Sequence, residues 1–442
     1  MKILIANRGE IAVRIIRACR ELGMHSVAVY STADRAALHT IIADESVCIG
    51  PPQVSQSYLN IKNVLAACEI TGAEFLHPGF GFLSENATFA DLCKKCGVTF
   101  IGPPSDVITL LGDKANAKET MKKAGVPVIP GSDGAVKSLE EAKKIAKEMG
   151  FPILIKAAAG GGGRGIRRVD NESELEHQII AAKEESKKFF GDDSIYIEKL
   201  LLEPKHIEFQ ILADSFGNVV HLGERDCSLQ RRRQKVLEET PSPVMTPELR
   251  EKMGNAAVSA AKASGYVNAG TIEFLVDKNS DFYFMEMNTR IQVEHPITEY
   301  VTGVDLVKEQ IRIAMGQKLS VTQEDIELNG HSIECRINAE KPTENFRPSC
   351  GKITALNLPG GNGVRIDSAI YQGYDIPPFY DNMLAKLIVK APNRQEAIMK
   401  MKRALSEFII DGVDTNIDFQ LDLLRMEEFE KGAYNNETLQ NQ

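Results

Sequence analysis

The chain has 442 residues, of which 43% are hydrophobic and 26% are charged, and its formal net charge at pH 7 is −9. These values describe an ordinary globular protein of several domains, and the negative charge argues against nucleic acid as a main partner because phosphate backbones require a basic surface. No run of roughly 18 or more apolar residues occurs, so no membrane span is expected. The eight cysteines are scattered, and the one Cys-x-x-C pair, Cys93 and Cys96, stands alone, which favours unreactive thiols in a reducing cytoplasm over a zinc or redox site.

Strands and helices alternate through residues 1–110. KILIA (2–6) and HSVAVYS (25–31) are predicted strands, and residues 10–23 between them form a predicted amphipathic helix. This alternation predicts a parallel sheet with helices on its faces, similar to a dinucleotide-binding fold. The first turn, NRGE, carries a single glycine, so dinucleotide binding is not predicted.

A glycine-rich stretch, KAAAGGGGRGIR, occupies residues 156–167. It satisfies the spacing of G-x-G-x-x-G, but IRRV (166–169) follows it as an extended segment, and the next helix is predicted only near 171–173. A P-loop is excluded because Ile166 and Arg167 stand where lysine and serine or threonine are required. The stretch therefore predicts two strands joined by a glycine turn, with cationic flanks suited to a phosphate.

The later part of the chain mixes strands and helices. A capping box at Ser138–Glu141 predicts a helix that ends at Gly150, and SIYIEKLL (194–201) is a predicted strand. Residues 271–288 read as a hairpin closed by a polar turn. From about residue 330 the pattern indicates a mixed α+β domain.

Three oxygen-donor side chains lie on the predicted hairpin: Glu273, Glu286 and Asn288. Glu286 and Asn288 share one strand face, and a register with Val276 opposite Tyr283 places Glu273 on that same face. Two carboxylates and an amide oxygen are what Mg²⁺ prefers, with water and phosphate completing its shell. The alternative is a salt-bridged pair on a solvated sheet face.

Two charged segments flank this hairpin. Arg290, Gln292 and Glu294 alternate along NTRIQVEHP (288–296), which could also mark an ordinary exposed strand. The basic run within residues 224–239, ERDCSLQRRRQKVLEE, is either a solvated face or a local anion site.

Taken in order, these motifs resemble the nucleotide site of the ATP-grasp superfamily. HPGFGFLSEN (77–86), QRRRQK (230–235) and EMNTRIQVEHP (286–296) narrow the resemblance to biotin carboxylase. It extends from NRGEIAVRIIRA (7–18) to IIDGVDTNI (409–417), almost the whole chain.

The resemblance implies an α/β and α+β chain with the ATP-grasp fold. A Rossmann-like domain would cover residues 1–110, the ATP-grasp domain 111–314 with a mobile lid at about 130–203, and a mixed α+β domain 315–442. The glycine hairpin would belong to that lid and close over ATP. The positions that match the family's ATP-binding residues are Lys114, Lys156, Gly162, Gly163, Glu198, Lys199, Leu200, Leu201, His206, Gln230, Glu273 and Glu286.

The implied reaction is ATP- and bicarbonate-dependent carboxylation of biotin N1′ through carboxyphosphate, by a ligase that forms a C–N bond. Two Mg²⁺ or Mn²⁺ ions would be held by Glu273, Glu286 and Asn288. Bicarbonate would be bound by Lys235, Arg290, Gln292 and the Val293 backbone. Glu294 would be the base, and Arg336 would bind biotin and stabilise its enolate-like oxygen.

Biotin is expected on a separate carrier protein, and carboxyltransferase subunits are the expected partners of a homodimer, in which Arg14 and Glu21 match interface positions. Met-Lys-Met around Lys400 imitates a biotin acceptor but has helical spacing, which argues against biotinylation there. Arg233 departs from the family, which often has histidine at this position, so a nucleotide contact is not assigned to it.

Acetyl-CoA carboxylase, and hence fatty acid synthesis, is the expected system, with a pyruvate or other acyl-CoA carboxylase as the alternative. The competing functions are another ATP-grasp ligase, such as carbamoyl-phosphate synthetase or a purine-pathway carboxylase, and a catalytically inactive protein that only binds nucleotide.

Overall fold

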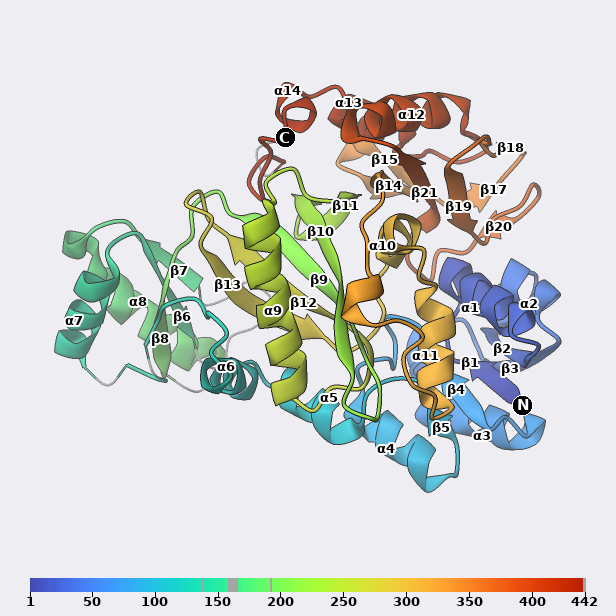
Figure 1. Cartoon of the computed structure of the whole chain (residues 1–442), viewed down its shortest axis with the longest axis horizontal. Helices are drawn as coiled ribbons and strands as arrows, with labels where there is room; N and C mark the ends of the chain where they lie inside the picture. The colour runs from blue at the N-terminus through green and yellow to red at the C-terminus, as the bar shows by residue number, and fades with distance from the viewer. Residues whose placement is uncertain (133, 137, 158–165, 191–192, 440–442) are drawn as a thin grey trace. The chain divides into compact units, whose positions relative to one another are not determined.

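The computed structural model describes residues 1–132, 134–136, 138–157, 166–190 and 193–439. The chain divides into two compact units (Figure 1). Unit 1 comprises Met1–Val126, Lys205–Leu275 and Glu286–Gln442, and unit 2 comprises Pro127–Pro204 and Val276–Met285.

Unit 1 begins with the predicted alternation of strands and helices. The first five strands of this unit form a parallel sheet in the order β3-β2-β1-β4-β5. Helix α1 buries Ile11, Ile15 and Ile16, which recur at helical spacing, against this sheet. The elements are β1 (Lys2–Ile5), α1 (Gly9–Glu21), β2 (His25–Ser31), α2 (Leu38–Ile42), β3 (Glu45–Gly50), α3 (Ile61–Thr71), β4 (Phe75–His77), α4 (Ala87–Lys95), β5 (Thr99–Phe100), α5 (Ser105–Gly112) and α6 (Lys114–Lys123).

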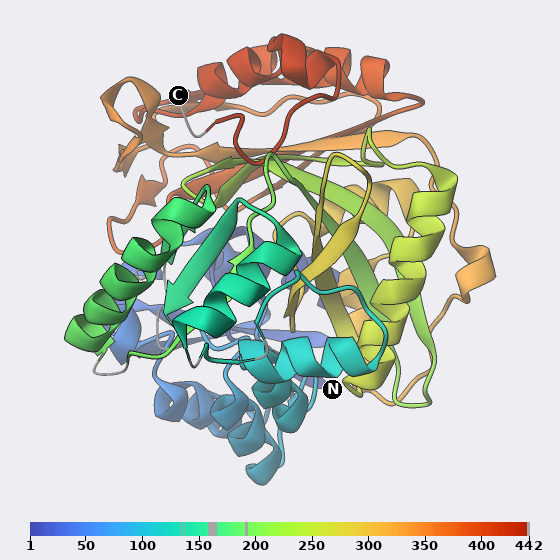
Figure 2. The same cartoon turned by 90° about the vertical axis from the view of Figure 1, so that its left-hand side faces the viewer.

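An eight-stranded sheet forms the rest of the framework, in the order β13-β12-β9-β10-β11-β14-β21-β19. Helix α9 runs along β9 and β10 (Figure 2). The elements that lead to the C-terminal part are β9 (Lys205–Ala213), β10 (Val219–Arg231), β11 (Gln234–Thr240), α9 (Pro247–Ala263), β12 (Asn268–Val276), β13 (Phe282–Asn288), α10 (His295–Thr302) and α11 (Leu306–Ala314).

The C-terminal part completes this sheet and covers one of its faces. Helix α12, drawn in red in Figure 1, packs on β21 and β14, where Leu387 and Cys335 face it. Smaller two-strand pairs connect the longer elements. The elements are β14 (His331–Asn338), β15 (Glu340–Lys341), β16 (Arg347–Pro348), β17 (Gly351–Lys352), β18 (Ala355–Asn357), β19 (Val364–Ser368), β20 (Asp375–Ile376), β21 (Met383–Ala391), α12 (Arg394–Glu407), β22 (Ile409–Asp411), α13 (Ile417–Leu423) and α14 (Glu427–Glu430).

The opposite face of β11, β14, β21 and β19 is polar because side chains alternate along each strand. Glu238 pairs with Glu334, Arg336 with Lys386, and Lys386 with Asp367 across neighbouring strands. Helix α10 packs on β14 and β21, and its preceding turn lies over this polar face. One sheet thus carries an apolar core on one face and a row of buried charges on the other.

Unit 2 contains a three-stranded antiparallel sheet in the order β7-β6-β8. Strands β6 (Ile153–Ala157) and β7 (Ile166–Val169) pair as predicted for the flanks of the glycine stretch, while Gly162 and Gly163 lie outside the described residues. Helix α7 (Leu139–Met149) begins at Ser138, whose hydroxyl accepts the Glu141 N–H at 3.1 Å, and ends at Gly150 with φ of 70°. The other elements are α8 (Glu172–Phe190) and β8 (Ile195–Lys199).

One expectation about local structure was wrong. Residues 290–294 do not continue the strand, because β13 ends at Asn288 and α10 begins at His295. Pro296, in the first turn of α10, lacks an N–H and fits there at no cost, which favours helix initiation at this point. No helix among the described residues has the length and apolarity needed to cross a bilayer.

A buried ion cluster joins the sheet to the C-terminal segments. The Glu239 carboxylate on β11 lies 2.6 Å from His331 Nε2, accepts hydrogen bonds from Arg394 at 2.8 and 3.0 Å, and accepts one from the Tyr434 hydroxyl at 2.6 Å. Burial alone would raise the pKa of Glu239, but hydrogen bonds from His331 and Arg394 lower it from 4.5 to about 2.

We expect Glu239→Gln to lower the free energy of unfolding at pH 7 by about 3 kcal/mol, the linkage value of such a shift. Between pH 4.5 and about 2 the unfolded carboxyl binds a proton while the folded one does not, so this stabilisation, complete above pH 4.5, falls as the pH falls through that window. Denaturation followed by circular dichroism measures it, since the chain has no tryptophan. The exposed Glu427→Gln is the control, and equal stability of the two variants at pH 7 would contradict the prediction.

Candidate active site

A lysine whose side chain is 12% exposed forms the centre of the site. The Nζ of Lys235, on β11, lies 2.6 Å from Glu208, 3.1 Å from Glu273 and 2.6 Å from Glu294. Burial works to lower the pKa of Lys235, but Cys227 and these three carboxylates raise it well above its ordinary value. The lysine is therefore a fixed cation.

Glu294 receives two cations at once. It precedes α10 and is fully buried, with Oε1 bound to Lys235 and Oε2 bound to Arg336 Nη2 at 3.0 Å. Burial works to raise the pKa of Glu294, but Lys235, Arg336 and Arg225 lower it well below its ordinary value. At neutral pH the carboxylate is ionised, which is the form that a base requires.

The predicted metal-binding side chains come together at the end of β12 and β13. Glu273 Oε1 accepts hydrogen bonds from Asn288 at 2.8 Å and Gln292 at 2.9 Å, and Glu273 Oε2 lies 3.1 Å from His206 Nε2. Glu286 lies 3.7 Å from Lys114. The pKa of Glu286 is raised mainly by burial and, to a lesser extent, by repulsion from Glu273.

This donor set fits a divalent cation. Two carboxylates that repel one another, with an amide oxygen beside them, match the hard oxygen ligands of Mg²⁺. His206, Glu208 and Glu273 also lie close enough together to share an ion, but Arg225 binds one Glu208 oxygen and Lys235 binds the other, whereas Glu286 meets Lys114 at the longer distance of 3.7 Å. The set Glu273, Glu286 and Asn288 is therefore the better candidate.

The turn after β13 is held by a chain of polar contacts. Arg290 donates to Asn288 Oδ1 at 3.0 Å, to Gln292 Oε1 at 3.1 Å and to Glu85 Oε2 at 3.0 Å. Gln292 and Arg290 thus meet in this turn and not along a strand edge, whereas Glu294 turns toward Lys235. The structure brings together the predicted bicarbonate-binding residues, although their expected linear arrangement was wrong.

Arg336 extends from the polar face of β14. Its guanidinium donates to Glu238 Oε1 from Nε at 2.7 Å as well as to Glu294. Burial raises the pKa of Glu238 to about 7, a shift that Arg336 opposes. Arg336 is therefore a half-buried, oriented cation beside the predicted base.

The remaining predicted nucleotide residues lie in both units. In unit 1, Gln230 on β10 donates to His206 Nδ1 at 2.9 Å, and Lys114 at the start of α6 is largely exposed. In unit 2, Lys156 on β6 pairs with Glu198 on β8. The backbone N–H groups of Lys199 and Leu200 donate to Pro130 and Pro152, and Leu201 follows the end of β8.

Several residues of the site were not predicted from sequence. Glu208 and Arg225 bind each other at 2.6 Å and enclose Lys235, and Glu85 orients Arg290. The pattern His206, Glu208, Gln210 was a usable signal, because alternate polar side chains interrupt the buried strand β9. Glu238 gave a weaker sequence signal, namely that it lies shortly after the basic segment QRRRQK (230–235).

The predicted dimer positions and Lys400 have contacts within the chain. Arg14 is buried and binds Glu299 at 2.9 Å and Asp305 at 2.6 Å, while the exposed Glu21 meets Lys308 at 2.5 Å. Lys400 lies in α12, as its spacing predicts, and donates to the Lys390 carbonyl.

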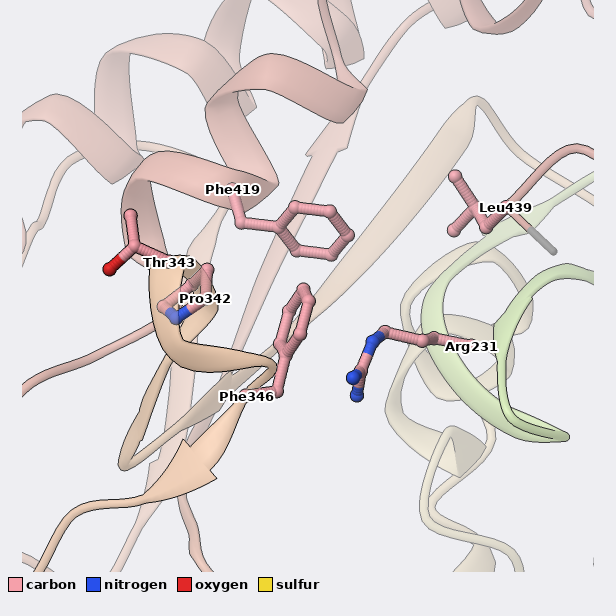
Figure 3. Close-up of a pocket in the computed structure, with 6 residues that line it drawn as sticks. All are labelled: Arg231, Pro342, Thr343, Phe346, Phe419 and Leu439. Carbon is pink, nitrogen blue, oxygen red and sulfur yellow. The ribbon is translucent and has the colours of Figure 1, made fainter. Parts of the chain in front are cut away.

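The tip of the β10–β11 hairpin borders a pocket of about 270 Å³ (Figure 3). The Arg231 guanidinium stacks 3.5 Å from the centre of the Phe346 ring, which contacts Phe419 edge to face. Arg233 occupies the exposed turn with φ of 66°, a left-handed conformation. The pocket is lined by Arg231, Pro342, Thr343, Phe346, Phe419 and Leu439, and none of these was a predicted site residue.

Three family models match the chain. "Biotin carboxylase, N-terminal domain" covers residues 1–108, "Carbamoyl-phosphate synthase L chain, ATP binding domain" covers 113–322, and "Biotin carboxylase C-terminal domain" covers 334–441. The middle model is named for another ATP-grasp enzyme, but both flanking models are specific to biotin carboxylase.

Individual relatives agree with these models. Biotin carboxylase 1 of Bacillus subtilis (strain 168) is 57% identical over 440 residues, 99% of this chain and 98% of that protein. A pyruvate carboxylase subunit of Methanothermobacter thermautotrophicus is 59% identical over 431 residues, 98% of this chain and 88% of that protein.

A solved structure resembles the whole chain. It is the biotin carboxylase domain dimer of Hydrogenobacter thermophilus 2-oxoglutarate carboxylase in complex with MgADP, ADP and bicarbonate, with 53% identity, 99% of this chain and 96% of that one covered, and a TM-score of 0.89. Together with a site in which Lys235 and Arg336 bind the Glu294 carboxylate, these matches show that the chain belongs to the biotin carboxylase family of ATP-grasp ligases.

Proposed function

We propose that this biotin carboxylase uses ATP and bicarbonate to carboxylate N1′ of biotin on a separate carrier protein. The observation that carries the proposal is the pair of cations, Lys235 and Arg336, bound to the two oxygens of Glu294 beside a divalent-metal donor set. The nucleotide phosphates, the bicarbonate and the biotin each then have an oppositely charged or hydrogen-bonding partner.

The metal donors would place the triphosphate. Glu273, Glu286 and the Asn288 amide oxygen hold Mg²⁺ or Mn²⁺, which neutralises phosphate charge when bound. Lys114 and Lys156 add point charges, and Gly162 and Gly163 admit phosphate oxygens close to the backbone. The backbone of residues 198–201, together with His206 and Gln230, binds the nucleoside part of ATP.

Bicarbonate binds Lys235, Arg290, Gln292 and the N–H of Val293. Its negative charge draws Lys235 partly away from Glu294, and the loss of that cation raises the basicity of the carboxylate. Glu294 then accepts the bicarbonate proton while a bicarbonate oxygen bonds to the γ-phosphorus and ADP leaves. The product, carboxyphosphate, breaks down to CO₂ and phosphate.

Arg336 acts in the second half of the reaction. The released phosphate takes the N1′ proton of biotin, negative charge develops on the ureido oxygen, and N1′ bonds to the carbon of CO₂. A guanidinium already oriented by Glu238 stabilises that charge without reorganising, which is the basis of electrostatic catalysis.

The assembly and the final acceptor form a further part of the proposal. We infer the three-domain division at 1–110, 111–314 and 315–442, a homodimer, and partners that carry biotin and transfer its carboxyl group. We favour acetyl-CoA as the acceptor, since relatives named biotin carboxylase match this chain along 98% and 96% of their length. The relative named for pyruvate carboxylase supports pyruvate as the second candidate.

The first test measures ATP hydrolysis by the purified chain. We expect hydrolysis to depend on bicarbonate and to be stimulated by free biotin, and Glu294→Gln to lower it about 10²–10³-fold because the base is lost. ATP binding by the variant, measured by calorimetry, should be unchanged. The exposed Glu327→Gln serves as the control, and hydrolysis by Glu294→Gln at the parent rate would show that Glu294 is not the base.

Arg336→Lys separates the two halves of the reaction. The substitution keeps the positive charge but loses the fork that binds Glu238 and Glu294 together, so we expect biotin carboxylation to fall about 10²-fold. Biotin-independent ATP hydrolysis by the same variant should fall much less. An equal loss in both assays would contradict a specific role for Arg336 toward biotin.

The acceptor is tested by reconstitution. Carboxylated carrier made by this chain is supplied to partners that co-purify with it, together with labelled bicarbonate and either acetyl-CoA or pyruvate. We expect label in malonyl-CoA, whereas label in oxaloacetate alone would replace acetyl-CoA by pyruvate.

A further inference from the structure

A fully buried lysine contacts the turn between β13 and α10. Lys386, on β21, is 0% exposed, and its Nζ donates to the Val293 carbonyl at 2.8 Å. Glu10 of α1 lies 3.1 Å and Asp367 of β19 lies 3.9 Å from the same Nζ. Burying an ammonium group is costly unless it is paired, so these carboxylates hold in place a charge that contacts the backbone of the turn.

The contact fixes a particular peptide plane. Because a peptide is planar and trans, fixing the Val293 carbonyl also fixes the N–H of Glu294 and the direction in which its Cα leaves the turn. The preceding plane is fixed in the same way, since His295 Nδ1 lies 2.8 Å from the Gln292 carbonyl and must donate to it. Burial keeps the pKa of His295 well below its ordinary value, so the ring is neutral. Both peptide planes around Val293 are therefore held by side chains.

We propose that Lys386 is a positioning residue for the carboxylation reaction: its ammonium group orients the Val293–Glu294 peptide, so that the Glu294 carboxylate faces bicarbonate beside the Val293 N–H, whose own peptide is held by His295. The inference rests on the roles proposed above for those two residues. Lys386 does not touch the reacting atoms; it acts through the backbone.

The same strand offers a matched control. Lys390 lies four residues along β21, on the same face, and its Nζ donates to the Tyr300 carbonyl of α10 at 2.7 Å. It makes the same type of contact, but with a carbonyl inside α10 and not with the turn that carries Glu294. A purely structural lysine–carbonyl contact is thus tested beside the proposed positioning contact.

The experiment compares Lys386→Met, Lys386→Met with Glu10→Gln, and Lys390→Met in the full chain. The double variant removes the carboxylate that the single variant leaves unpaired in the interior. We expect both Lys386 variants to raise the KM for bicarbonate and lower kcat, each about tenfold, while the KM for ATP stays within about twofold, because the lost interaction orients only the bicarbonate side. Lys390→Met should leave all three values near those of the parent.

Glu294→Gln is assayed in the same series to keep the two proposals distinct. If Glu294→Gln hydrolyses ATP at the parent rate, the role proposed for Glu294 as the base fails. If Glu294→Gln is inactive but the double Lys386 variant has parental kinetics for bicarbonate, only the positioning role is overturned. The positioning role would also be overturned by equal changes in the KM for ATP and for bicarbonate, by a matching defect in Lys390→Met, or by failure of both Lys386 variants to fold. Each of these results would mean that Lys386 only stabilises the fold.

Discussion

A cation shared by three buried carboxylates determines the arrangement of this site. Lys235 is shared by Glu208, Glu273 and Glu294, and each carboxylate belongs to a different element, so the lysine joins β9, β12 and the turn before α10. Separating any of these groups would leave a buried charge without a partner, which is strongly unfavourable. The strands are therefore held in register by electrostatics at the point where the substrates are proposed to bind. The apolar cores on the other faces support this arrangement but do not specify it.

An anionic substrate can change the pairing of charges in this cluster. With no substrate, Glu294 has two cationic partners and low basicity. A bicarbonate ion competes for one of those cations, so binding of the substrate itself makes the carboxylate a better base. The preference for an anion and the timing of proton transfer then have the same physical origin. The raised pKa of Glu286 beside Glu273 shows the converse case, in which two carboxylates face each other and a divalent cation would relieve the repulsion.

The sequence predicted the elements near the site better than the path of the turn. The alternation of strand and helix patterns identified the N-terminal parallel sheet, and the segments flanking the glycine stretch identified β6 and β7, because these are local patterns. Family resemblance brought forward Lys235, Glu294 and Arg336, whose side chains do meet. Periodicity was wrong for residues 290–294, where Pro296 starts a helix and the polar side chains turn inward. Glu85 and Lys386 could not be found from spacing, since each is brought to the site by a contact between elements distant in sequence, whereas Glu208 had a signal in the alternating polar residues of β9. The domain boundaries and the roles of the site residues stay predictions.

Strand β14 has one further consequence for how this protein can change. Cys335 faces the apolar core and the next residue, Arg336, faces the charged cluster, so both surfaces depend on a single alternation. Loss or gain of one residue in that strand would point the Arg336 guanidinium into the apolar core and the Cys335 thiol toward the charged cluster. Length variation in this family must therefore accumulate in the loops on either side of β14, while the strand itself tolerates substitution but not a change of length.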